Sequence, residues 1–234
     1  MVHCVASTVS MALIADGLLA AGARPMMTET PAEAPVVTLK ADALLVNLGT
    51  LSTDAADGIP PTIASARAVA HPWVLNPAAV GAAPLRTPLA VGLLDQGPSI
   101  VRANASEILV LAGMGSGGRG ADATDQVGDA EGSARAVARR TGGVVAVSGP
   151  TDLVTDGHRT AFVPGGTPLL TRVSGTGCLL GALTAACAAV APPWEAALAA
   201  STWLATAGEL AATGSAGPGT FRVALVDALD ATWR

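Results

Sequence analysis

The stretch TRVSGTGCLLGALTAACAAVA, residues 171–191, places two glycines and a cysteine at the start of an apolar segment of helical length. Gly175 and Gly177 leave the first backbone N–H groups of the predicted helix open and let a ligand approach them closely. The stretch therefore predicts an anion-binding site at the mouth of a buried helix. A structural alternative stays open, in which the glycines only allow the helix to pack tightly on a sheet.

Two common nucleotide-binding motifs match this stretch poorly. A Walker A loop needs Gly-Lys-Ser/Thr, which does not follow Gly177. Gly175, Gly177 and Gly181 loosely match a dinucleotide fingerprint, but they stand late in the chain, and no acidic residue closes a second strand about 20 residues further on. A dinucleotide-dependent oxidoreductase is therefore kept only as an alternative.

The composition favours one domain over residues 1–234. Half of the 234 residues are hydrophobic and 13% are charged, which suffices for one sizeable α/β core. The formal net charge is −5, and Lys40 is the single lysine, so the sequence has no basic stripe to neutralise a phosphate backbone. Nucleic acid is not expected as a partner.

The apolar segments do not indicate a membrane protein. The uncharged run from Cys178 to Ala191 is shorter than the ~20 residues that a spanning helix needs. The N-terminal segment lacks a basic region and is interrupted by Asp16, so we expect a folded helix of a cytoplasmic protein there, not a signal peptide. The three cysteines, Cys4, Cys178 and Cys187, lack metal-ligand spacing and are expected to be free thiols.

Helical and strand-like segments alternate along the chain, which is typical of a mostly parallel sheet covered by helices on both faces. The Gly-rich segment 113–125 is expected to be a mobile loop. The predicted helices span 7–21, 32–41, 61–71, 104–112, 130–141, 175–191, 194–212 and 219–232. The predicted strands span 24–28, 43–49, 73–77, 99–103, 144–149, and the paired segments 152–157 and 159–163.

Several further motifs follow one another along the chain. They are VHCVASTVSMALIADGLLAAGARPMM, ADALLVNLGTL, WVLNPAAVGAAPLRT, IVRANASEILVLAG, VVAVSGPTDLVTDG and GTPLLTRVSGTGCLLGAL. Their order and approximate spacing resemble those of the hydroxyethylthiazole kinase family of thiamine salvage. The resemblance implies a ribokinase-like three-layer α/β fold. It also implies phosphorylation of the primary alcohol of 4-methyl-5-(2-hydroxyethyl)thiazole by Mg²⁺-ATP, and a homotrimer with the thiazole site at the subunit boundaries.

The resemblance also assigns catalytic roles to the opening stretch. The amides from Gly175 to Cys178, including Gly177, would stabilise the transferring phosphoryl group together with the helix dipole. Cys178 stands where related sugar kinases have an aspartate base, and a helix N-terminus favours the thiolate form of a cysteine. The thiol is therefore expected to accept the proton of the substrate hydroxyl; a buried structural cysteine is the alternative.

Further residues match family positions that contact ligands. Arg102, Ser148 and Thr176 are expected to bind ATP, and Met27, His3 and Gly175 to line the substrate site. Glu107 and Asn76 are expected on the metal side. Each has a structural alternative; Glu107, for example, would also complete a capping box with Asn104 at the start of a helix.

The chain departs from the family at several of these positions. Val5-Ala6-Ser7 replaces the usual Ile-Thr-Asn, Ala103 stands at a common glycine, and Asn76 replaces an aspartate. The last change keeps one acceptor oxygen but removes the charge that attracts Mg²⁺. Two further alternatives therefore stay open, a catalytically impaired ligand-binding paralogue and a kinase of a neighbouring alcohol such as hydroxymethylpyrimidine.

Overall fold

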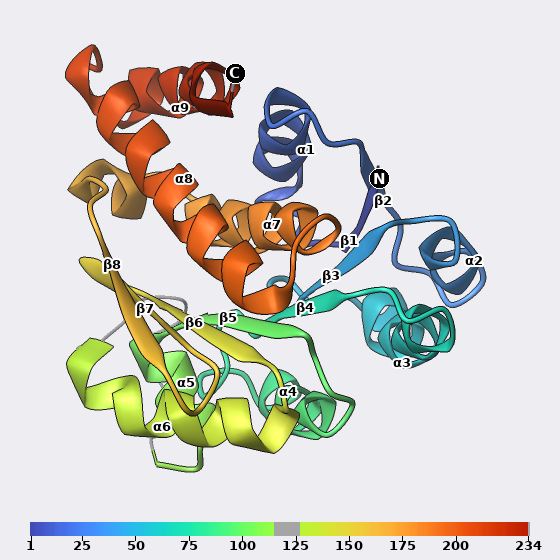
Figure 1. The fold of residues 1–234 in the computed structure, drawn as a ribbon. Coiled ribbons are helices and arrows are strands. Elements are labelled where there is room, and N and C mark those ends of the chain that lie inside the picture. Colours follow the sequence, from blue (N-terminus) through green and yellow to red (C-terminus); the bar gives the residue numbers. More distant parts are fainter. Residues whose placement is uncertain (115–126, 234) are drawn as a thin grey trace.

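The structure, a computed structural model, describes residues 1–114 and 127–233 (Figure 1). The Gly-rich segment predicted as a mobile loop, 113–125, lies almost wholly outside the described residues. Within the described part, eight strands form one sheet in the order β2-β1-β3-β4-β5-β6-β7-β8. Strands β1 to β6 run parallel, whereas β7 and β8 add an antiparallel hairpin at one edge. The strands are β1 (Val2–Val5), β2 (Pro25–Met27), β3 (Ala43–Asn47), β4 (Trp73–Asn76), β5 (Ile100–Asn104), β6 (Val144–Ser148), β7 (Thr151–Thr155) and β8 (Thr160–Pro164).

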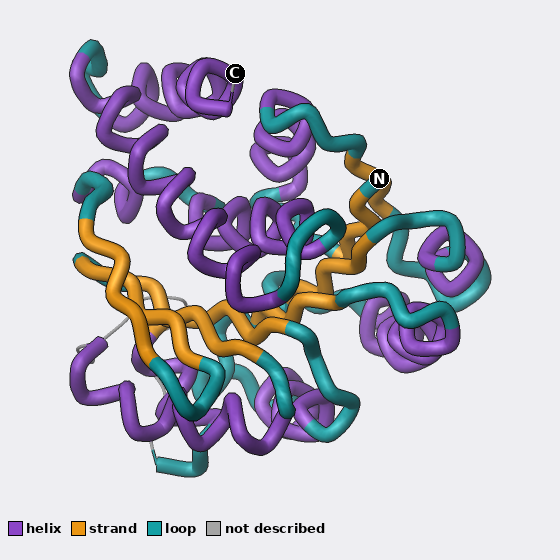
Figure 2. Tube along the Cα trace, in the orientation of Figure 1, coloured by secondary structure: helices purple, strands orange, loops and turns teal. Residues whose placement is uncertain are grey.

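Helices cover both faces of the sheet, so the predicted three-layer α/β fold is confirmed (Figures 1 and 2). The first face carries α2 (Ala34–Thr38), α3 (Thr53–Ala68), α4 (Arg86–Leu94), α5 (Ala105–Leu111) and α6 (Val127–Thr141). The opposite face carries α1 (Met11–Ala20), the short 3-10 helix η1 (Pro168–Arg172), α7 (Thr176–Ala188), α8 (Pro193–Thr213) and α9 (Pro218–Trp233). Helix α7 lies directly over β1, β3, β4 and β5.

Alternate side chains of each central strand enter different cores, as the pleat of a strand requires. Leu44 and Val46 of β3 pack with α3 on one face, and Leu45 packs beneath α7 on the other. A third core cluster, which includes Leu179 and Phe221, joins α7, α8 and α9 on top of the second layer. The fully buried strands explain why the sequence shows continuous apolar runs in place of alternation.

Strand β1 was not predicted, although it lies between β2 and β3 inside the sheet. All four residues, Val2–Val5, are buried, so the segment carries no alternating pattern that marks a strand. The helix predicted from residue 7 begins at Met11, with Ser10 at its N-cap. The intervening residues form the turn that carries the chain from the strand end to α1.

Two helices on the first face also differ from the prediction. Helix α3 begins at Thr53, not at residue 61, because the Ser52 side chain caps its start by accepting from the Ala55 N–H at 2.9 Å. Pro60 and Pro61 lie inside the helix, although their sequence position favours a helix start. Helix α4 was missed altogether, since Pro88 and Gly92 weaken its sequence signal.

The helices of the described residues also bear on membrane insertion. None of them combines the length and the apolar character that crossing a bilayer requires.

Candidate active site at the carboxyl ends of the parallel strands

Polar residues end four neighbouring parallel strands at the same edge of the sheet. Because open α/β sheets bind ligands at the carboxyl ends of their strands, this edge is the candidate active site. The four strand-ending residues are Asn47 of β3, Asn76 of β4, Asn104 of β5 and Ser148 of β6.

The start of α7 opens at this edge. Gly175 is the N-cap of α7 and has a φ of 93°, a left-handed conformation that favours glycine. A Cβ on Gly175 would come within 2.8 Å of the Ser10 Cβ, so a side chain has no room there either. Gly175 therefore begins α7 at the positive end of the helix dipole, and the anion contacts expected of its first-turn N–H groups stay a prediction.

Thr176 is held by the backbone before α7. Its hydroxyl lies 2.6 Å from the carbonyl oxygen of Leu170 and 3.3 Å from that of Val173, and the residue is 8% exposed. The hydroxyl proton thus fixes η1 to the start of α7. The expected ATP contact of Thr176 stays a prediction.

Arg102, Ser148 and Gly177 come together at the centre of the site. The Arg102 Nη2 donates to the Ser148 Oγ, and a Cβ on Gly177 would stand 2.8 Å from the Arg102 Nη1. Arg102 is 8% exposed, and its Nε is buried without a hydrogen-bond partner among the described residues. The same part of the chain places no carboxylate oxygen within 4.0 Å of the guanidinium. A nearly buried guanidinium without an ion-pair partner favours the binding of an anion.

Glu107 links the loops that follow β4 and β5. Its Oε2 accepts from the Asn104 N–H at 2.9 Å and completes the predicted capping box, while its Oε1 accepts from the Ala79 N–H at 3.0 Å. Burial raises the pKa of Glu107, against the lowering effects of the Asn104 N–H, the charge of Arg102 and the Ala79 N–H. Both carboxylate oxygens of Glu107 therefore already accept hydrogen bonds from backbone N–H groups.

Asn76 is buried beneath the first turn of α7. Its Nδ2 donates to the Gly177 carbonyl oxygen at 3.5 Å and would lie 3.1 Å from a Cβ on Gly181. The NH₂ group of the Asn76 side chain, and not its oxygen, therefore faces α7. Among the described residues, no group of three or more His, Cys, Asp or Glu side chains is arranged to hold a metal ion. The metal-side roles expected of Glu107 and Asn76 stay predictions.

The residues expected on the substrate side lie at the neighbouring strand ends. Cys178, in the first turn of α7, and Met27, at the end of β2, are half-buried and pack at the margin of one core cluster. His3 is fully buried; its Nε2 bonds to the Thr28 carbonyl oxygen at 2.9 Å and its Nδ1 to the Thr38 hydroxyl. Burial lowers the pKa of His3, against the raising effect of the bond to the Thr28 carbonyl, and so favours the neutral ring. With both ring nitrogens engaged, His3 fixes the segment that follows Met27.

Sequence reasoning missed two polar residues at this edge. Asp152, in β7, accepts from the Gly149 N–H at 3.0 Å directly after Ser148. Ser10 occupies the N-cap position of α1 without a side-chain capping bond. Its Cβ lies 2.8 Å from where a Cβ on Gly175 would stand, and its hydroxyl donates to the Ser7 carbonyl oxygen at 3.1 Å. The pattern Ser-Gly-x-x-Asp at 148–152 is a turn signal that could have drawn attention to Asp152.

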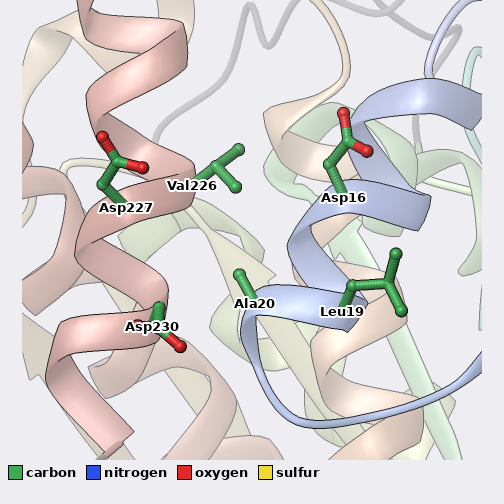
Figure 3. Close-up of a pocket in the computed structure, with 6 residues that line it drawn as sticks. All are labelled: Asp16, Leu19, Ala20, Val226, Asp227 and Asp230. Atoms are coloured by element: carbon green, nitrogen blue, oxygen red, sulfur yellow. The ribbon is translucent and has the colours of Figure 1, made fainter.

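One surface hollow of the described residues lies elsewhere, away from the strand ends. It measures about 410 Å³ between α1 and α9 and is lined by three carboxylates and three apolar side chains (Figure 3). Its acidic residues would repel a phosphate, so it does not compete with the strand-end site. The lining residues are Asp16, Leu19, Ala20, Val226, Asp227 and Asp230.

The position of α7 argues against the dinucleotide alternative. In that motif the glycines follow a strand and open the helix of the same βαβ unit. Here Gly175 follows the 3-10 helix η1 (Pro168–Arg172), so the strand–turn–helix context is missing.

Comparisons with known proteins agree with this geometry. A sequence model of the hydroxyethylthiazole kinase family matches residues 1–233. The hydroxyethylthiazole kinase of Cronobacter sakazakii is 49% identical, covering 99% of this chain and 88% of the relative. That of Corynebacterium glutamicum is 45% identical, covering 98% of this chain and 87% of the relative.

Solved structures show the same fold. The structure of a hydroxyethylthiazole kinase protein from Pyrococcus horikoshii superposes with a TM-score of 0.90 at 34% identity, covering 98% of this chain and 87% of that one. A pyridoxal kinase from Staphylococcus aureus shares the fold at a TM-score of 0.69 and 19% identity, covering 89% of this chain and 87% of that one. The expected ribokinase-like fold is confirmed.

Proposed function

The chain belongs to the hydroxyethylthiazole kinase family and is a phosphotransferase with an alcohol as acceptor, and from this premise we propose its reaction and the roles of its residues. The proposed reaction moves the γ-phosphoryl group of ATP to the primary hydroxyl of 4-methyl-5-(2-hydroxyethyl)thiazole. Phosphoryl transfer needs positioning and charge neutralisation more than covalent help. The strand-end site offers both.

The observation that carries the proposal is the environment of Arg102. Its guanidinium is nearly buried and lies against Gly177, and no carboxylate of the described residues is within ion-pair distance. A buried cation is costly unless anions neutralise it. Glu107 and Asp152 act on Arg102 only from beyond ion-pair distance, so the site favours a bound phosphate. The chain carries a formal net charge of −5, so the positive charge at Arg102 is a local feature of this site and not part of a generally basic surface.

The start of α7 supplies the second half of the phosphate site. The N–H groups from Gly175 to Cys178 point out of the positive helix end and can stabilise charge that develops on the transferring group. Cys178, in the same turn, is the proposed general base for the substrate hydroxyl. Ser148, bonded to Arg102, is the proposed ATP contact on the β6 side.

The thiazole is proposed to bind next to Met27, toward the β2 edge of the sheet and away from Arg102 in β5. A flexible thioether suits a flat sulfur heterocycle, and the half-buried Met27 packs at the same core margin as Cys178. His3 is proposed to act indirectly, since its ring nitrogen Nε2 bonds to the carbonyl oxygen of Thr28, the residue after Met27.

Mg²⁺ is proposed to enter with ATP as the nucleotide's own partner ion. The ion dehydrates reluctantly and keeps several waters, so phosphate oxygens can provide its direct ligands. Asn76 is then proposed to reach the ion only through metal-bound water. Glu107, whose oxygens accept from the Asn104 and Ala79 N–H groups, is proposed to support the loops around the ion. We further propose one kinase domain over 1–234, a homotrimer with sites at subunit boundaries, and a cytoplasmic location.

A second candidate, an impaired ligand-binding paralogue, is favoured by Asn76 alone, because a neutral amide replaces a family carboxylate. One experiment separates the two functions. Purified protein is incubated with Mg²⁺-ATP and thiazole, pyrimidine and sugar alcohols, ADP release is followed, and the phosphorylated product is identified by mass. Turnover with the thiazole alcohol supports the kinase; ADP binding without turnover of any alcohol supports the paralogue.

A further inference from the structure

Asp152 stands beside the proposed phosphate site, yet it has no part in the roles assigned so far. It is the second residue of β7, it is partly buried, and its Oδ1 accepts from the Gly149 N–H at 3.0 Å. Gly149 follows Ser148 directly, so the carboxylate closes the turn that carries the hydroxyl proposed to contact ATP. A carboxylate bond to a backbone N–H is one of the stronger hydrogen bonds in proteins.

The turn between β6 and β7 is held from three sides. The Arg102 Nη2 donates to the Ser148 Oγ from β5, and the Val127 Cγ2 of α6 lies 2.3 Å from where a Cβ on Gly149 would stand. Asp152 provides the third constraint. Without it, the Gly149 amide loses its acceptor and the turn can leave Arg102, because one hydroxyl bond and one apolar contact remain.

The carboxyl group of Asp152 is subject to opposing electrostatic effects. Burial raises the pKa of Asp152, against the lowering effects of the Gly149 N–H, the charge of Arg102 and the Ser201 hydroxyl of α8. The carboxylate is outside ion-pair distance of Arg102 within the described residues, so it leaves the guanidinium fork open for a ligand. It can therefore attract and orient Arg102 without occupying it.

We propose that Asp152 is a positioning residue of the nucleotide site, whose carboxylate fixes the Gly149 amide and thereby holds Ser148 against the Arg102 guanidinium. The proposal rests on the proposed function, since it takes Arg102 and Ser148 as the phosphate contacts. It assigns Asp152 no contact with the reacting atoms. Loss of its acceptor should therefore weaken nucleotide binding more than the thiazole side of the reaction.

Two substitutions separate the hydrogen bond from the charge. Asp152→Asn keeps an acceptor oxygen for the Gly149 N–H, whereas Asp152→Ala removes it. We expect ADP affinity, measured by titration calorimetry, to fall about tenfold in Asp152→Ala and to stay within about threefold of the parent in Asp152→Asn. In turnover assays the KM for ATP should rise in parallel, with the KM for the thiazole alcohol unchanged.

Asp156→Asn is the matched control. Asp156 is also a β7-side carboxylate that accepts backbone N–H bonds, at 3.0 Å from His158 and 2.9 Å from Arg159, but it lies at the far turn of the hairpin. A merely structural effect of weakening this hairpin would lower ADP affinity in Asp156→Asn as well. Parental ADP affinity in Asp156→Asn, with a loss in Asp152→Ala, supports positioning.

Other outcomes overturn the proposal. Parental ADP affinity in folded Asp152→Ala removes Asp152 from the site, and an equal loss in Asp152→Asn shows that charge, not the Gly149 bond, matters. If Asp152→Ala does not fold, Asp152→Glu is tested in its place. The longer glutamate side chain should displace the Gly149 amide and lower the affinity for ADP about fivefold. Parental ADP affinity in Asp152→Glu would contradict the proposal. Because ADP binding is measured without turnover, failure of the kinase assay leaves this test intact.

Discussion

The backbone of Gly177 lies against the tip of Arg102, so that a Cβ on Gly177 would stand 2.8 Å from Nη1 and 3.3 Å from Nη2. Gly175 has a left-handed backbone conformation, whereas Gly177 does not. The two glycines of the opening motif therefore differ in purpose. Gly175 is required by backbone conformation, and Gly177 by the approach of a guanidinium to the first turn of α7.

Gly177→Ala is expected to displace Arg102 without unfolding the protein. The atom in the way is the end of a flexible side chain, and alanine favours the helix by about 0.5–1 kcal/mol. We expect the KM for ATP to rise about tenfold, with a melting temperature at or slightly above that of the parent. Gly92→Ala is the control, since nothing lies within 4 Å of its Cβ position; parental ATP kinetics in Gly177→Ala would place the phosphate elsewhere.

Cys178→Ser tests the proposed base. The change nearly preserves volume but replaces the thiol with a hydroxyl that gives up its proton far less readily, so we expect kcat to fall about 100-fold with little change in ADP affinity. Cys178→Asp restores a base and should recover much of the loss. The comparison is made as full pH profiles of kcat between pH 6 and 9. A serine variant that follows the parent over this range excludes the thiol from proton transfer.

Local sequence signals predicted those parts of the fold that depend on neighbours in the chain. The capping box of Asn104 and Glu107 was predicted residue by residue, because both partners lie within one helical turn. Strand β1 was missed since burial on both faces removes its pattern. Helix α3 was shortened because Pro60 and Pro61 are normally signals of a helix start.

The candidate site shows the same division. The start of α7 at Gly175 could be predicted from Gly175 and its neighbours, whereas its binding of an anion stays a prediction. The second role of Glu107 could not, because its bond to the Ala79 N–H joins residues 28 positions apart. The direction of the Asn76 amide toward Gly177, 101 positions away, likewise depends on how α7 lies over β4.

Asp156 gives a pH-dependent stability that is separate from the site. Backbone N–H bonds and Arg159 lower the pKa of Asp156 from 3.8 to about 2. Because the folded value is the lower one, the stabilisation is present above pH 3.8 and is lost as the pH falls toward 2. Asp156→Asn should therefore melt about 1–3 °C below the parent at pH 7, with the difference shrinking between pH 4 and 2. A constant difference in calorimetric scans across that window would contradict the assignment.

Substitutions of Asn76 and of Glu107 should change the Mg²⁺ requirement for turnover differently. In Asn76→Asp a carboxylate replaces the donor that faces the Gly177 carbonyl at 3.5 Å. We expect the metal-free variant to lose about 1–3 kcal/mol of stability, since the two oxygens repel and a buried donor is lost. The new charge should also attract the metal, so the Mg²⁺ concentration for half-maximal turnover should fall severalfold.

Glu107→Gln should leave that Mg²⁺ concentration unchanged, because the Glu107 oxygens already accept from Ala79 and Asn104. The amide retains one acceptor and turns an NH₂ group toward the other N–H, so we expect a loss of about 1–3 kcal/mol in stability at every Mg²⁺ concentration. Turnover and melting are measured along one Mg²⁺ titration for the parent and both variants. A shifted Mg²⁺ requirement in Glu107→Gln would put this carboxylate on the metal's water shell. An unchanged requirement in both variants would place neither residue near the metal, and the site would then rest on Arg102 and the start of α7.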